Sequence, residues 1–283
     1  MMARLVVSLC VVIFLAAFTP AQDPVSAEVQ GSDQSDTEEK WVAEDDFPTT
    51  VQLFEALAAR KNPRWRTLYR PPLGVTFPAR TKSAFWLGVN ISELYLAVHA
   101  RDAQRVSNLS RDLEAFGRNL GVSKIMHDGI VTLNGHAQKG DWADAKEEVG
   151  RTSGLVKKAL AEQEDGNLAV LVLCGEWIRN VEVSASVVDA EAFDDLALAA
   201  GGQRVFLHLH EELRETKFEE NEEARLQLLR KKIGELSDLW KQDDEATPTM
   251  EDVNGTHAAV TEILDRFSEN DSPKKKPKPR DES

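Results

Sequence analysis

Apolar residues recur every three or four positions over most of this chain, which is the spacing of helices that bury one face. Six rows of this kind lie between Ala84 and Phe267. They are Ala84, Leu87, Ile91, Leu94 and Val98; Val106, Leu109, Leu113, Phe116 and Leu120; Val122, Met126, Gly129, Leu133 and Ala137; Trp142, Ala145, Val149, Thr152, Val156 and Leu160; Leu226, Leu229, Ile233, Leu236 and Trp240; and Val253, His257, Val260, Leu264 and Phe267. No stretch alternates apolar and polar residues long enough to predict a sheet.

Residues 168–188 form a further helix by the same reasoning, and they are apolar on nearly every side from Leu168 to Ile178. A helix of this kind is usually buried by its neighbours. Residues 189–200 and 203–216 predict two shorter helices separated by two glycines. Because the connections are short, successive helices should pack antiparallel. The sequence therefore predicts an all-α, antiparallel multi-helix bundle of about eight to ten helices, with possible helical-hairpin repeat character.

Local signals mark where several of these helices begin and end. Gly121 and Gly140 follow the second and third rows, where a left-handed residue can end a helix. Asp141 is placed to cap the next helix. Residues 247–249, Thr-Pro-Thr, precede the last one.

The N-terminus has the layout of a secretory signal peptide. Arg4 precedes an uncharged apolar run from Leu5 to Phe18, and small residues follow up to Ala21. A second cleavage site lies after Ala27, and an uncleaved N-terminal anchor remains the alternative. A membrane span needs about 18 or more consecutive apolar residues, and no later stretch reaches that length. We therefore expect no stable transmembrane span after cleavage, and an exported protein that is periplasmic or extracellular.

Charge and composition divide the remainder into segments. The net charge of −14 argues against nucleic-acid binding, which needs clustered basic residues. The expected organisation is a signal peptide (1–21), an acidic disordered leader (22–46), a short helix with a basic, Pro- and aromatic-rich strap (47–81), the helical bundle (82–270) and a basic Pro/Lys disordered tail (271–283).

The strap region is the best candidate for binding a partner. Residues 61–80 hold five basic residues, no acid and four prolines. The candidates are Arg64, Trp65, Arg66, Tyr69 and Arg70, a basic and aromatic set suited to an anionic ligand, polymer or lipid surface. The other reading is a strap whose aromatic rings pack on the bundle while its arginines neutralise acidic helix surfaces.

Motifs for phosphate, dinucleotide, acyl-transfer or haem chemistry are absent from the sequence, so no cofactor is expected. His208 and Glu212 share a helix face and form a weak candidate metal pair. An ordinary solvated His–Glu pair is the commoner explanation.

Glu176 is unusual because it interrupts the most apolar helix. Arg179, three residues later, is the partner we expect for it. The alternative is a buried carboxylate with a raised pKa that works in a cavity.

These observations favour an exported helical protein that is not an enzyme and that binds or scaffolds an unknown protein or anionic envelope partner. The alternative is a helical enzyme or metal-binding protein whose site is assembled from Glu176 and dispersed histidines. A third hypothesis attaches the protein to an anionic envelope or lipid through the basic residues of 274–280. An enzyme should have a pocket where perturbed titratable groups converge, whereas a scaffold should present an exposed patch.

Overall fold

The structure, a computed structural model, describes residues 49–61, 63–73, 77–163, 165–188, 203–217, 223–240 and 249–269, all within the compact unit Ala43–Ser283. These residues form α-helices and one short 3-10 helix, η3, and contain no strand, which confirms the all-α multi-helix fold. The elements are α1 (Thr50–Lys61), η3 (Trp65–Leu68), α2 (Arg80–His99), α3 (Ala103–Leu120), α4 (Ser123–Lys139), α5 (Trp142–Glu162), α6 (Gly166–Val187), α8 (Gln203–Glu215), α9 (Glu223–Leu239) and α10 (Met250–Ser268). The signal peptide, the leader, the helix expected at 189–200 and the basic tail lie outside the described residues.

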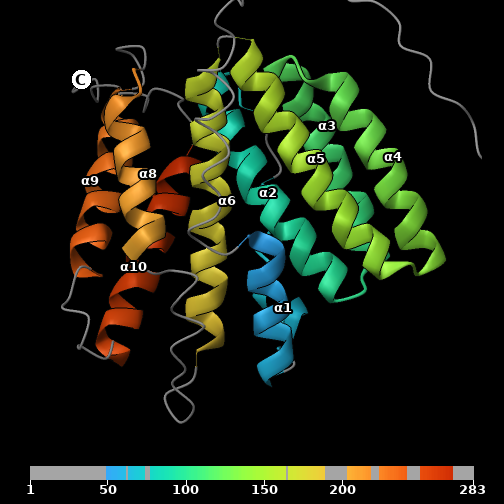
Figure 1. The fold of residues 1–283 in the computed structure, drawn as a ribbon, viewed down its shortest axis with the longest axis horizontal. Coiled ribbons are helices and arrows are strands. Elements are labelled where there is room, and N and C mark those ends of the chain that lie inside the picture. Colours follow the sequence, from blue (N-terminus) through green and yellow to red (C-terminus); the bar gives the residue numbers. More distant parts are fainter. Residues whose placement is uncertain are drawn as a thin grey trace, which may run out of the picture. The chain divides into compact units, whose positions relative to one another are not determined.

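Helices α2 to α5 follow one another through short turns, and each packs beside the next (Figure 1). Gly121 and Gly140 end α3 and α4 with φ of 78° and 81°, as the sequence predicts, because a residue without Cβ adopts this conformation without strain. Arg101 takes the same left-handed region, with φ of 51°, in the turn between α2 and α3.

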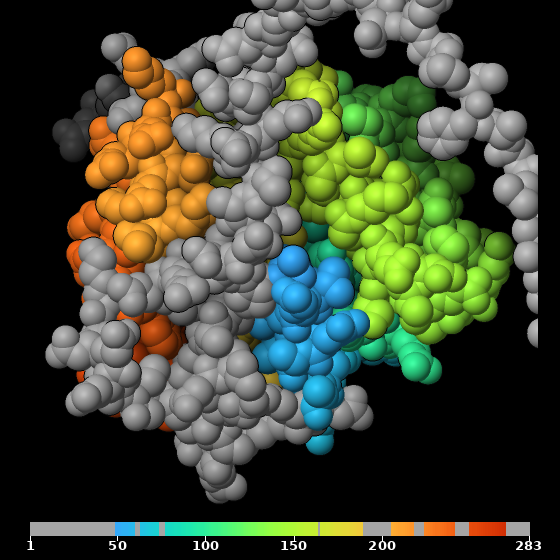
Figure 2. Space-filling model, viewed as in Figure 1, coloured from blue at the N-terminus to red at the C-terminus, as the bar shows by residue number. Residues whose placement is uncertain are grey.

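The two most buried helices, α2 and α6, cross at two glycines. A Cβ atom on Gly88 would lie 1.9 Å from the carbonyl oxygen of Val172, and one on Gly175 would lie 1.9 Å from that of Phe85. The two backbones therefore touch, which only glycine allows. On the face shown in Figure 2, α1, α5 and α8 lie outermost and little of α2 is visible.

The second helical group, α8 to α10, packs against the other side of α6 (Figure 1). Helix α10 begins with a capping box, in which the Thr249 and Asp252 side chains bind each other's backbone N–H groups. At its other end, the ring of Phe267 stacks on Phe85 at 4.0 Å, and the Trp86 indole donates to the Phe267 carbonyl. These contacts join the end of α10 to α2.

Helix α1 is the short helix expected within residues 47–81, and it belongs to the same core as the bundle. Leu53, Phe54 and Leu57 are all buried within that core. Of the helices that the structure describes, none combines the length and apolarity that a bilayer crossing requires.

Candidate functional site

The strap, defined here as residues 63–73, is attached to the bundle by its tryptophan. Trp65 lies in η3 and is only 7% exposed. Its ring centroid is 5.8 Å from that of Phe54 on α1 and 5.1 Å from that of His99 on α2. Trp65 is therefore a core residue that fixes the first turn of the strap.

Two arginines of the bundle bind the strap's backbone. Arg179 on α6 donates a hydrogen bond to the Leu68 carbonyl, and Arg105 on α3 donates one to the Arg70 carbonyl at 2.8 Å. In the opposite direction, the Arg70 amide donates to a carboxylate oxygen of Glu93 at 3.3 Å. Three helices thus hold a segment that has few backbone hydrogen bonds of its own.

The same arginines form a buried ion cluster, defined here as Arg70, Glu93, Arg105, Arg179 and Glu182. Two nitrogens of Arg179 lie 2.8 and 2.6 Å from one oxygen of Glu93, and a third lies 2.5 Å from Glu182. Arg105 binds the other oxygen of Glu93 at 2.8 Å. The Glu93 and Arg179 side chains are each 3% exposed. Burial of these charges is tolerated because every one has an opposite charge and further hydrogen bonds.

Arg70 extends the buried ion cluster from the strap to the surface. Its guanidinium lies 2.5 Å from Glu182 on α6 and 2.8 Å from Asp265 on α10, which is 65% exposed. With Asp265 included, three arginines face three carboxylates, so the charges balance. The cluster therefore links the strap with α2, α3, α6 and α10.

A small cavity lies beside the buried ion cluster, beneath Pro71 and Pro72 of the strap. Its volume is about 40 Å³, and its polar lining includes Asn90, Glu93 and Arg105. Ligand pockets usually have about 300–1,000 Å³, whereas a cavity of this size holds one or a few water molecules. This cavity is therefore too small for a substrate.

Tyr69 packs beside the buried ion cluster, with the guanidinium of Arg105 over its ring. The Arg105 guanidinium lies 4.9 Å from the centre of the Tyr69 ring. Burial, with the nearby Asp102 charge, raises the pKa of the Tyr69 phenol to about 12. Tyr69 therefore stays neutral and contributes packing and a cation–π contact.

An open depression of about 810 Å³ lies between α9 and α10, lined by residues that include Leu228 and His257. Its carboxylates are engaged by cations. Glu262 binds Lys232 at 2.8 Å, Asp265 binds Arg70 and Glu269 binds Arg266 at 2.7 Å. None of these three carboxylates is therefore free to bind a cationic ligand in the depression.

Glu176 is buried as the sequence indicates, but the partner expected for it is wrong. Its carboxylate accepts hydrogen bonds from Thr50 at 2.8 Å and Ser153 at 3.2 Å, and it lies 3.4 Å from the Lys157 ammonium. Arg179 instead binds Glu93 and Glu182. The partners of Glu176 thus lie on α1 and α5, whereas those of Arg179 lie on α2 and on α6 itself.

A chain of buried polar groups continues from Glu176 into the core. Asn180 donates to the Thr50 hydroxyl at 2.9 Å and accepts from Ser92 at 2.7 Å. Burial, and then the Glu176 charge, raises the pKa of Tyr95. This chain ties α1, α2, α5 and α6 together.

Each histidine on an apolar row has its own surroundings away from Glu176. His99 stacks on Phe54 and packs against Trp65 at an angle, and burial lowers its pKa to about 4, aided by the Lys146 charge. His127 lies 3.4 Å from Glu114, and His257 lies 3.2 Å from the Ser186 hydroxyl. The structure therefore gives no converging set of Glu176 with these three histidines.

The weak candidate metal pair, His208 and Glu212, lies one turn apart on α8 with both residues half-buried. Among the described residues, no third His, Cys, Asp or Glu joins them within ligating range. Within the described part of the chain, three potential metal ligands do lie close together. They are His136, Asp141 and Asp144, in the turn between α4 and α5.

The five candidate partner-binding residues fall into two sets. Trp65, Tyr69 and Arg70 are engaged inside the molecule, as the strap reading expects. Arg64 and Arg66 are exposed, and Arg66 keeps 67% of its side chain in solvent although its Nε lies 3.4 Å from Asp102.

Sequence reasoning missed Glu93 and Glu182, which complete the buried ion cluster. The signal for Glu93 was present, because it interrupts an apolar helix just as Glu176 does. Arg105, which binds Glu93, carries no such signal, since an arginine beside an apolar row is ordinary.

Comparison of the chain with protein-family models, curated proteins and solved structures finds no match.

Proposed function

We propose that this protein is an exported, non-enzymatic helical protein that binds a partner through the strap, in the periplasm or the extracellular medium. The observation that carries the proposal is the attachment of the strap, which the buried ion cluster holds from three helices while Arg64 and Arg66 face solvent. Anionic groups on an envelope polymer, lipid or protein are the ligands that these side chains suit.

Arginine at these positions supports an anionic partner. The guanidinium is always charged and offers a planar set of donors that fits carboxylate and phosphate. Because the strap is already fixed, binding costs less ordering entropy than it would for a free loop. Arg64 and Arg66 flank the buried Trp65, so their backbone positions are set by a core residue.

The use of the buried carboxylates also supports a binding role. Glu93 and Glu182 are paired with arginines, and Glu176 is paired with Lys157 and two hydroxyl groups. Catalytic carboxylates have to face a substrate, whereas these three face neighbouring helices.

The experiment is a binding assay of the full chain with anionic phosphatidylglycerol vesicles and with neutral phosphatidylcholine vesicles, at low and at physiological salt. We expect binding to the anionic vesicles that weakens with salt. Each surface basic residue contributes about 1 kcal/mol, so reversing both charges in the variant Arg64→Glu/Arg66→Glu should weaken binding at least tenfold.

Two further variants separate the strap from other charges. Arg111→Glu/Arg118→Glu makes the same charge change at two exposed positions of α3 and should reduce binding much less. Deletion of 273–283 tests attachment through the basic tail. The role of the strap would be refuted if the two double variants lost the same amount of affinity for anionic vesicles. It would also be refuted if only the tail deletion removed that binding.

A further inference from the structure

The turn between α4 and α5 brings one histidine and two aspartates together. His136 lies in the last turn of α4, Asp141 at the N-cap of α5 and Asp144 in its first turn. Gly140 adopts φ of 81° between them, and the Asp141 amide donates to the His136 carbonyl at 3.0 Å. The backbone of this turn is therefore fixed by its own hydrogen bonds.

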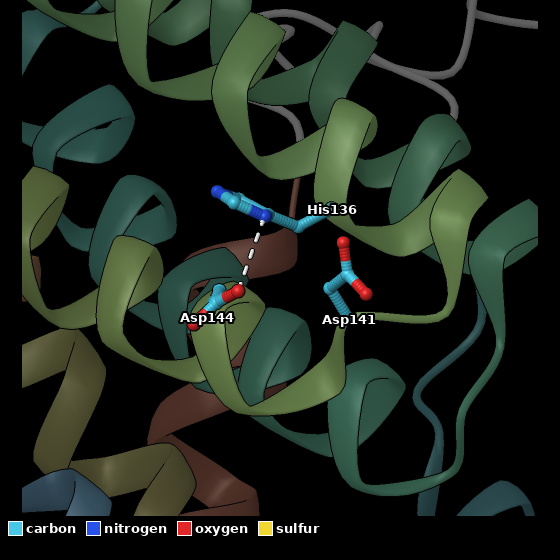
Figure 3. A group of neighbouring side chains, drawn as sticks. All are labelled: His136, Asp141 and Asp144. Carbon is cyan, nitrogen blue, oxygen red and sulfur yellow. Dashed lines mark ion pairs between the residues drawn. The ribbon is translucent and has the colours of Figure 1, made fainter.

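The potential ligand atoms of these three side chains lie within 4.8 Å of one another. The Nδ1 atom of His136 is 3.8 Å from a carboxylate oxygen of Asp144, and the three side chains gather on one side of the turn (Figure 3). Ligand atoms that share a metal at about 2.0–2.2 Å are roughly 3.0–3.5 Å apart. Small side-chain rotations are enough to close that difference.

The donor atoms are not committed to other bonds. His136 Nδ1 is buried and forms no hydrogen bond. Asp141 makes no side-chain capping hydrogen bond, whereas Asp102, at the same position of α3, accepts one from the Arg105 amide at 3.0 Å. Asp144 is 61% exposed, which leaves an open path for an ion.

We propose that His136, Asp141 and Asp144 bind a divalent first-row transition-metal ion such as Zn²⁺, with water in the remaining positions. One imidazole with two carboxylates suits Zn²⁺ and its neighbours, whereas Ca²⁺ and Mg²⁺ prefer oxygen ligands alone. None of the three residues belongs to the strap, so the site can be tested separately from the proposed partner binding.

The test is a titration of the full chain with Zn²⁺, followed by calorimetry and by competition with a chelating indicator. We expect the wild-type chain to bind one more equivalent than the variants His136→Ala and Asp144→Asn, with at least about a tenfold loss of affinity for that equivalent. Co²⁺ absorption gives a second readout, since a coordinated histidine changes the visible spectrum of the ion.

The matched control is His127→Ala, which removes an exposed histidine of the same helix that also faces a carboxylate. It should bind Zn²⁺ as the wild type does. Asp144→Asn keeps the test valid if His136→Ala impairs folding, because Asp144 is exposed. The proposal is overturned if wild type and both site variants bind alike, if His127→Ala loses the same equivalent, or if micromolar Zn²⁺ leaves the wild type unoccupied.

Discussion

The guanidinium of Arg179 on α6 contacts the carboxylate of Glu93 on α2 through two nitrogens, and both side chains are 3% exposed. The two residues are far apart in sequence, and their contact helps to fix the position of α2 along α6. Because Arg179 also binds the Leu68 carbonyl, this one side chain connects the helix crossing with the strap.

Replacing Arg179 with methionine should strongly destabilise the fold. The change keeps much of the side chain's volume but leaves Glu93 and Glu182 without their shared cation, which costs about 3–5 kcal/mol when a buried pair is broken. Arg266→Met is the control, because Arg266 pairs with Glu269 three residues later, as Arg179 does with Glu182, but the two side chains are 56% and 59% exposed. Its expected cost is about 0–1 kcal/mol. Urea unfolding measures both, and similar losses would contradict the structural role of Arg179.

Alanine at Gly88 should disturb the crossing of α2 and α6. Its Cβ would lie 1.9 Å from the Val172 carbonyl oxygen, a backbone atom that cannot move aside alone. We expect a loss of about 1–3 kcal/mol or more in the free energy of unfolding. Gly154→Ala, in α5 with open space around it, should instead stabilise by about 0.5–1 kcal/mol. Thermal unfolding of the pair tests this, and a harmless Gly88→Ala would exclude the close crossing.

The buried histidine predicts a pH dependence of stability. His99 has a pKa of about 4 in the folded chain against 6.5 for an unperturbed histidine side chain. Between these values the unfolded chain binds a proton that the folded chain does not. The free energy of unfolding therefore falls as the pH decreases from 6.5 toward 4. Below pH 4 this histidine adds no further change. The whole effect amounts to at most about 3 kcal/mol.

His99→Phe should remove that part of the pH dependence. Phenylalanine keeps the ring contacts with Phe54 and Trp65 and eliminates a buried nitrogen, Nε2, that has no hydrogen-bond partner. Unfolding measured from pH 4 to 7 should give a flatter curve for the variant. Curves of the same slope would show that His99 is not buried in its neutral form.

Removing the strap's anchor should loosen the strap's backbone and make it susceptible to protease. Trp65→Ala deletes the ring packed between Phe54 and His99, at a cost of about 3–5 kcal/mol for a large aromatic residue. Trypsin should then cut after Arg64 or Arg66 sooner than elsewhere in the bundle, as peptide mapping reveals. Thr67→Ala, at an exposed position of the same 3-10 helix, should leave cleavage slow.

Helix positions were largely predictable because each depends on local spacing. The ends of α3 and α4 at Gly121 and Gly140 follow from the residue type that adopts a left-handed φ without strain. Asp141 does occupy the N-cap of α5, but its side chain makes no capping bond. The residue's position was readable from the sequence, whereas its side-chain direction was set by the turn.

Side-chain partners between helices were not predictable from one sequence. Helical spacing places Glu176 and Arg179 near each other, yet it says nothing of Lys157 or Glu93 on the helices packed beside them. Whether two neighbouring charges on one helix form an ion pair depends on which opposite charges the packed helices place near them. The strap illustrates the same limit, since its composition alone fitted both a buried and a displayed role for Trp65.

The most direct measurement of the central claim, that a buried ion cluster holds the strap and the two central helices together, is a double-mutant cycle of Glu93→Gln and Arg179→Met in urea unfolding. We predict that the two losses are not additive, with a coupling energy of about 2–3 kcal/mol. A coupling energy within about 0.5 kcal/mol of zero would contradict the account, because independent residues behave that way.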